Sequence, residues 1–181
     1  MRQKLDESIA LLSRTPAALD SLLRGLPDAW TRRNEGTGSW TPRDVVAHLA
    51  ELERTDWMPR IQRILKHGDA RAFDPVDRQA FIRNARGKSL NRLLSDFARL
   101  RQKNLREVHR LKLGSKDLAR PGRHPALGSV TLSELIAAWV VHDLSHLHQI
   151  ARILAYQYGD AVGPWNRYLG VLQCNGHSAS A

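Results

Sequence analysis

The sequence predicts an all-α protein, a bundle of four main helices with additional short helices. Three observations predict this class. Long segments carry apolar residues at helical spacing, segments rich in glycine and proline separate them, and no alternating strand pattern exceeds a few residues. The 181 residues are 42% hydrophobic without a break in composition, so we expect one domain over residues 1–175 and a flexible tail over 176–181.

Six segments have the helical spacing. They cover residues 4–23, 41–66, 76–84, 89–111, 131–156 and 164–172, of which the third and the last are short. Pro16 predicts a kink or a break inside the first segment, and Gly25 ends it. Residues 31–40 contain two glycines and no period, so they form a loop. Thr41 then provides an N-cap hydroxyl, and Pro42 occupies the first helical position.

The later boundaries have similar signals. Gly68 ends the second segment, and Ser89 caps the fourth. Residues 114–129 are rich in glycine, proline and charge, and they predict a long connection without a regular element. Thr131, followed three residues later by Glu134, forms a capping box that opens the longest uninterrupted helical segment.

The segment over 131–156 places two histidines where an ordinary helix carries hydrocarbon. At about 100° per residue, His142 and His146 fall on the apolar stripe, and Gln149 lies beside them. The stripe also contains Leu135, Trp139, Ile150 and Ile153. Three residues are expected to point away from it: Val141, His148 and Arg152. Two imidazoles one turn apart can reach a single metal ion, but buried histidines also occur in hydrogen-bonded cores. A third ligand elsewhere in the sequence would favour the metal site.

His48 is the candidate third ligand. It lies at the edge of the apolar stripe of segment 41–66, next to Leu52. Glu51 and Asp56 lie on or near the same flank, where either could accept a hydrogen bond from an imidazole N–H or provide a further ligand. The alternative for Glu51 is a solvated helix carboxylate. His124, which precedes a proline in the long connection, is a weaker ligand candidate.

The net charge of +10 and the pI of about 10.6 favour a polyanionic partner such as nucleic acid. The arginines, however, are spread through the helices among acidic residues, which is typical of a solvated surface. Arg101 belongs to this set, although the apolar stripe of the fourth segment passes through Leu100 or Arg101. The sequence contains neither a helix-turn-helix pattern nor an RNA-binding strand signature, so we do not expect nucleic-acid binding.

Other features concern the cellular compartment. The N-terminal residues are amphipathic and include acidic side chains, unlike a signal peptide, and no stretch approaches the roughly 20 apolar residues of a membrane span. The single cysteine, Cys174, cannot form an internal disulfide and is expected to be a small packing residue or a free surface thiol. We therefore expect a soluble cytoplasmic protein without membrane contact.

Three stretches together resemble the DinB-like superfamily, which includes the YfiT-like metal-dependent hydrolases and the thiol-dependent S-transferases. They are WTPRDVVAHLAELE at 40–53, HPALGSVTL at 124–132 and WVVHDLSHLHQIARILAYQYGDAVGPW at 139–165. The resemblance spans residues 40–169 and is most specific in the last long helix. It implies a DinB-like four-helix bundle that holds one divalent ion, usually zinc or nickel, through His48, His142 and His146.

Three neutral imidazoles leave an open position on a zinc-type ion, which can lower the pKa of water or of a thiol, or polarise a carbonyl. The leading hypothesis is therefore a metal-dependent enzyme acting on a small molecule. In a hydrolase, water would attack with Glu51 or Asp56 as general base; in an S-transferase, a low-molecular-weight thiol would be the nucleophile. The arginines would suit an anionic substrate, and similar bundles often form homodimers.

Two other classes of function stay open. A non-catalytic, stress-related metal-binding bundle would use the ion only to join helices, and a fourth ligand from Glu51 or His124 would favour that class. A nucleic-acid-binding protein is motivated by the charge of +10 and by the DNA-damage association of the family's name. Its affinity for duplex DNA would fall steeply with salt concentration.

Overall fold

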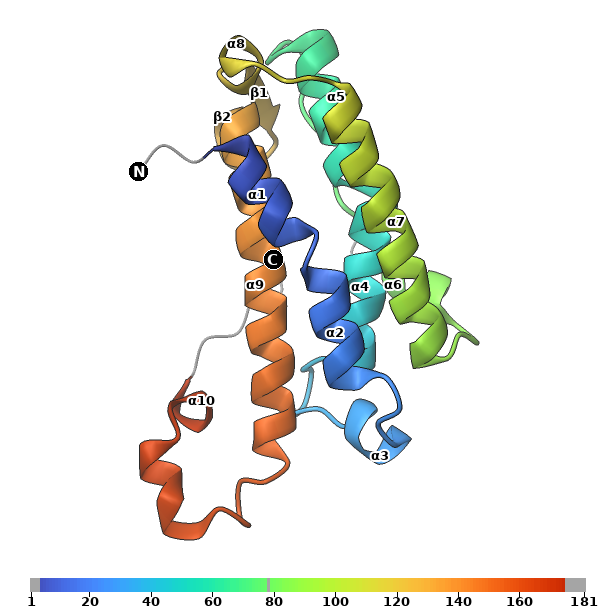
Figure 1. The fold of residues 1–181 in the computed structure, drawn as a ribbon, viewed down its shortest axis with the longest axis vertical. Helices are drawn as coiled ribbons and strands as arrows, with labels where there is room; N and C mark the ends of the chain where they lie inside the picture. Colours follow the sequence, from blue (N-terminus) through green and yellow to red (C-terminus); the bar gives the residue numbers. More distant parts are fainter. Residues whose placement is uncertain (1–3, 78, 175–181) are drawn as a thin grey trace.

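The computed structural model describes residues 4–77 and 79–174 and shows a four-helix bundle, as the sequence predicts (Figure 1). The four positions are occupied by α1 (Leu5–Leu12) with α2 (Thr15–Leu23), α4 (Pro42–Thr55) with α5 (Trp57–His67), α7 (Leu90–Arg110) and α9 (Leu132–Tyr156). The short helical elements are α3 (Asp28–Thr31), α6 (Ala80–Ala85), α8 (Ser115–Leu118), the 3₁₀ helix η1 (Gly163–Tyr168) and α10 (Gly170–Gln173). The predicted tail over 176–181 lies outside the described residues.

Two of the four positions hold divided helices. Pro16 lies in the first turn of α2, so the predicted break in segment 4–23 is confirmed. The single helix predicted over 41–66 is corrected, because Asp56 separates α4 from α5. The backbone at Asp56 has φ −117° and ψ −67°, so its φ departs strongly from the ideal helical value of about −63°. Beyond this division, the buried Trp57 stacks on Trp139 of α9, with ring centroids 5.5 Å apart.

The predicted N-caps fix where the long helices begin. The hydroxyls of Thr41, Ser89 and Thr131 each accept a hydrogen bond from the backbone N–H three residues later, at 3.1, 3.2 and 3.2 Å. The helix that follows Thr131 contains no glycine or proline over its 25 residues. His142 and His146 therefore keep the one-turn separation that their spacing predicts.

The expectation of a long connection without a regular element was wrong. The chain there forms α8 and a two-stranded antiparallel hairpin, β1 (Pro121–His124) and β2 (Gly128–Thr131). The hairpin is held by tertiary contact: a Cβ on Gly122 would lie 2.5 Å from Ile64 Cγ1, so only glycine allows strand β1 to pack this closely on α5. Contacts of this kind with a distant helix leave no period in the local sequence.

The core consists of two apolar clusters with a polar layer between them along the helices. One cluster joins α2, α6 and the early parts of α4 and α7 to the end of α9, and the other joins α1, α5 and the end of α7 to the beginning of α9. Between them, α4, α7 and α9 carry buried polar residues: Glu51, Glu53, Arg101, Asn104, Asp143, His146 and Gln149. This layer contains the candidate site.

Across the described ranges, each helix is too short or too polar to be a membrane-spanning segment.

Candidate metal centre

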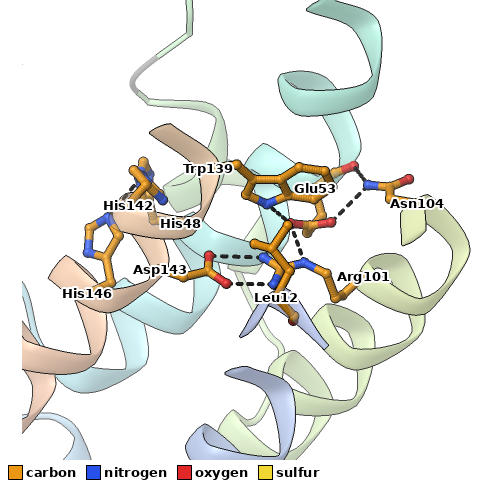
Figure 2. A network of polar contacts seen from close by, with 9 residues as sticks. All are labelled: Leu12, His48, Glu53, Arg101, Asn104, Trp139, His142, Asp143 and His146. Carbon is orange, nitrogen blue, oxygen red and sulfur yellow. Dashed lines mark hydrogen bonds and ion pairs between the residues drawn. The ribbon is translucent and has the colours of Figure 1, made fainter. Parts of the chain in front are cut away.

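Three histidines from two helices meet in the polar layer. His48 Nε2 of α4 lies 3.3 Å from His142 Nε2 of α9, and His142 Nε2 lies 3.1 Å from His146 Nε2 (Figure 2). One ligand atom from each of the three residues lies within 4.8 Å of the others. The structure therefore brings together the three histidines that the sequence singled out, which we call the histidine cluster.

The geometry of the histidine cluster fits a divalent ion. Zinc–nitrogen bonds of about 2.0–2.1 Å in a tetrahedral arrangement separate two ligand nitrogens by roughly 3.3 Å, close to the two Nε2 separations seen here. Hydrogen bonds alone cannot complete the cluster. His142 Nε2 carries at most one proton and so can donate to only one of its two neighbours. A cation accepts lone pairs from all three.

Gln149 fixes the orientation of one imidazole. Its side-chain Oε1 lies 2.8 Å from His146 Nδ1, so Nδ1–H donates to the amide oxygen and the lone pair of Nε2 points into the cluster. The other nitrogen of His142, Nδ1, is buried and has no hydrogen-bond partner among the residues described. With the proton of His146 on Nδ1, at most one of the two Nε2 contacts in the cluster is a hydrogen bond.

Burial keeps the histidines neutral, which is the form that binds metal ions. Desolvation, with a contribution from His146, lowers the pKa of His48 from 6.5 to about 3. Desolvation and the two neighbouring imidazoles lower the pKa of His142 to about 2. The pKa of His146 is also lowered by burial, and Gln149 and the Asp143 carboxylate oppose that shift.

Aromatic rings surround the histidine cluster. Trp40 lies 4.8 Å from the His48 ring and stacks at 6.1 Å on His146, measured between centroids. Phe81 meets His48 edge-on at 5.6 Å, and Trp57 meets His142 edge-on at 5.2 Å. The rings that contact the imidazoles are thus apolar, and they explain why desolvation dominates the pKa shifts.

The two carboxylates predicted near the site have other partners. Glu51 is buried, so the alternative of a solvated carboxylate is wrong; it accepts a hydrogen bond from Asn84 Nδ2 at 3.0 Å and pairs with Arg54. Asp56 is also buried, and its Oδ1 lies 2.8 Å from Arg60 Nε. Burial raises the pKa of Asp56, and Arg60 opposes that shift. Neither carboxylate belongs to the three-ligand group, and their catalytic role stays a prediction.

The remaining site predictions have mixed outcomes. His124 lies in the hairpin, outside the three-ligand group, and its Nδ1 accepts from two backbone N–H groups at 3.2 Å. Val141 and His148 are exposed, as expected. Arg152 was also expected to point away from the stripe; unlike the other two, its side chain is buried, and it pairs with Glu35. Cys174 is an exposed free thiol.

Sequence reasoning missed a second polar cluster in the same layer, centred on Arg101 (Figure 2). Arg101 was expected on a solvated surface but is 1% exposed. Its guanidinium binds Glu53 and Asp143, and Glu53 also accepts from Trp139 Nε1 at 3.0 Å and from Asn104 Nδ2 at 2.9 Å. We call these five residues the Arg101 network. The available signal was the apolar stripe of α7, which passes through position 101.

The Glu53 carboxylate accepts four hydrogen bonds within the Arg101 network. Burial raises the pKa of its carboxyl group, and the charge of Arg101, with hydrogen bonds from Arg101 and Asn104, opposes that shift. All four groups that bind its oxygens are N–H donors. They favour the ionised carboxylate, because that form only accepts hydrogen bonds. The Arg101 network is therefore a buried cluster of ion pairs in which the Glu53 carboxylate has hydrogen-bond donors on its oxygens.

Comparison with known proteins identifies the family. The family model of the DinB superfamily matches residues 11–150. YfiT from Bacillus subtilis, a probable metal-dependent hydrolase with an unusual four-helix bundle topology, is 23% identical, with a TM-score of 0.73 over 85% of this chain and 87% of that one. TT2238, a four-helix bundle protein, is 26% identical, with a TM-score of 0.58 over 82% of this chain and 98% of that one. Curated proteins gave no significant match. Because the family model covers most of the sequence, the chain belongs to the DinB superfamily.

Proposed function

We propose that this protein is a metal-dependent enzyme that acts on a small molecule, with one divalent ion, zinc or nickel, held by His48, His142 and His146. The observation that carries the proposal is the convergence of three Nε2 atoms from one buried and two partly buried histidines, with separations of 3.3 and 3.1 Å between neighbours. The similarity to YfiT, a probable metal-dependent hydrolase, supports the same class.

The ligand set supports a catalytic site over a purely structural one. Structural zinc sites are closed by four protein ligands, whereas catalytic sites keep a position open. In the part of the chain that the structure describes, the group that could hold an ion contains three histidines and no carboxylate. Glu51 and His124, the residues expected to close a structural site, are engaged elsewhere. Neither residue expected as a fourth ligand is therefore available for the non-catalytic, stress-related alternative.

Bound at this position, a divalent ion supplies Lewis acidity, lowering the pKa of water or of a thiol and polarising a carbonyl. The protein contributes three neutral imidazoles, a Gln149 amide that orients one of them, and aromatic rings that pack against the imidazoles. We favour the hydrolase class. In the S-transferase alternative, a low-molecular-weight thiol would be the nucleophile. Asp56 and Glu51 stay the general-base candidates; burial raises the pKa of Asp56, and Arg60 opposes that shift.

The substrate hypothesis follows from the residues around the site. Trp40, Trp57 and Phe81 are the aromatic side chains whose rings contact the histidine cluster, so we propose a substrate with an apolar part next to the reacting group. An anionic group elsewhere on the substrate, suggested by the basic composition, is a separate prediction. Screening esters and amides with and without a remote carboxylate would separate the two.

Metal analysis tests the proposal directly. Protein purified without a histidine tag or chelating column is expected to carry about one zinc or nickel ion per chain by elemental analysis. His146→Ala should lose the ion, because two imidazoles hold it much more weakly than three. His148→Ala is the matched control, since it removes an exposed histidine of the same helix. Wild-type protein that takes up no ion after reconstitution would contradict the proposal.

A homodimer and a cytoplasmic location complete the proposal. Between Leu135 and Ala155, the exposed residues of α9 are uncharged: Ala138, Val141, Leu144, His148 and Ala151. An uncharged helix face on a chain of net charge +10 supports self-association through α9. Light scattering is expected to give the mass of two chains for the wild type and of one chain for Leu144→Glu. A wild type with the mass of one chain would contradict the proposed homodimer.

Nucleic-acid binding is not part of the proposed function. Many arginines are held by carboxylates within the fold, as in the pairs Arg24–Asp20, Arg63–Asp74 and Arg83–Asp77. Such pairing makes these arginines less available for phosphate contacts, and the other basic residues are spread through the helices among acidic ones. Binding to duplex DNA should therefore be weak and without sequence preference, and a steep salt dependence at high affinity would revive that alternative.

A further inference from the structure

The Arg101 network joins the two helices that carry the histidine cluster (Figure 2). Arg101 of α7 binds Glu53 of α4 through Nε and Nη2, at 2.9 and 2.7 Å, and Asp143 of α9 through Nη1 and Nη2, at 2.6 and 2.9 Å. Glu53 follows His48 on α4 by less than two turns, and Asp143 directly follows His142 on α9. One side chain thus connects α4 to α9 beside the ligands.

The connection is rigid because every donor of the guanidinium is used. Nη1 also donates to the backbone carbonyl of Leu12, at 2.7 Å, so all five N–H groups of Arg101 have an acceptor. A planar group with five fixed bonds allows little sliding of one helix against another. The side chain is 1% exposed, so water does not compete for these bonds.

A second path runs from the same carboxylate to a ligand ring. The indole N–H of Trp139 donates to Glu53 Oε1, at 3.0 Å. Trp139 stacks on Trp57, and the Trp57 ring meets the imidazole of His142 edge-on with centroids 5.2 Å apart. Glu53, held by Arg101, therefore also fixes the aromatic pair that packs against His142.

We propose that Arg101 is a positioning residue for the metal centre: by binding Glu53 and Asp143 together, it sets how closely the histidine of α4 approaches the two histidines of α9. The inference rests on the proposed metal site. Coordination distances tolerate deviations of only about 0.2 Å, so a small shift between α4 and α9 weakens binding. The Arg101 network thereby determines the geometry of the ligands as well as the stability of the fold.

Cobalt(II) binding to the metal-free protein tests the inference, since cobalt reports both affinity and coordination geometry through its visible absorption. The variant is Arg101→Lys, which keeps the charge but has three donors on a flexible stem. We expect an affinity lower by about 10- to 100-fold and altered absorption bands, as for other residues that orient metal ligands. Arg99→Lys is the matched control, because Arg99 is an exposed arginine of the same helix.

The outcomes separate this inference from the proposed function. A wild type that binds no cobalt overturns both. A wild type that binds cobalt, with a folded Arg101→Lys variant of unchanged affinity and absorption, overturns the positioning role alone. If Arg101→Lys does not fold, the triple variant Glu53→Met, Arg101→Met, Asp143→Leu decides by the same two readouts, because it leaves no charge of the ion-pair cluster unpaired.

Discussion

The histidine cluster and the Arg101 network lie in the same polar layer and share helices α4 and α9. They differ in how their polar atoms are satisfied. Each N–H of the Arg101 guanidinium has an oxygen acceptor within 2.9 Å. In the histidine cluster, His142 Nε2 faces two other Nε2 atoms but can donate to only one, and His142 Nδ1 has no partner within the described part of the chain.

Burying a polar group costs free energy unless it gains a partner, so the difference has a functional meaning. The Arg101 network is complete with protein atoms alone, which suits a structural and positioning role. The histidine cluster cannot satisfy all of its Nε2 atoms with protein donors, which suits the proposed metal site. Two adjacent clusters in one polar layer can therefore be assigned different roles from their hydrogen bonds.

The largest expected effect is the loss of stability when the Arg101 network is broken. Arg101→Met leaves Glu53 and Asp143 buried without their cation, and we expect a loss of about 3–5 kcal/mol in the free energy of unfolding, measured by urea denaturation at neutral pH. Arg99→Met, on the exposed side of the same helix, should lose far less. If the two variants lost equal amounts of unfolding free energy, Arg101 would contribute no more to stability than an exposed arginine.

An intermediate effect is expected at the contact that orients His146. Gln149→Leu removes the acceptor for His146 Nδ1–H, and the affinity for zinc should fall by about 10- to 100-fold in a competition titration with a chelator. Gln149→Glu keeps an acceptor at this position and should retain tight binding. If the leucine variant binds zinc as the wild type does, Gln149 has only a packing role.

The smallest expected effect is the loss of stability of the metal-free protein for each unit by which the pH falls. His48 and His142 have folded-state pKa values of about 3 and 2, below the ordinary value of 6.5, so the unfolded chain takes up protons first as the pH falls. Their contribution to stability is complete above pH 6.5 and is lost as the pH decreases toward the folded-state values, by about 1.4 kcal/mol per pH unit for each histidine.

The acid effect can be assigned to one residue by comparing urea denaturation of wild type and His48→Phe from neutral pH down to about pH 5. The phenylalanine variant should lose stability less steeply with acid, since it has one titrating group fewer in the cluster. His148→Ala should have the wild-type slope, because His148 is exposed. A wild-type slope in His48→Phe would show that His48 is not desolvated in the folded protein.

Local signals predicted much of the fold correctly. The capping box at Thr131 and Glu134 and the absence of glycine and proline placed α9 correctly, and the one-turn spacing placed His142 and His146 on one face. These features depend on backbone geometry within a few residues, so the sequence contains them directly. His48 required more, namely the edge of a second apolar stripe and a family resemblance.

Contacts between distant segments decided the rest. The sequence by itself determined where the long helical segments begin, their N-caps and which histidines face the core. Only the tertiary structure determined that Arg101 is buried, because burial of an arginine depends on Glu53 and Asp143, which lie on two other helices. The hairpin likewise depends on how Gly122 packs against Ile64. Local periodicity reports which face of a helix is apolar, whereas the pairing of buried charges depends on the packing of several helices together.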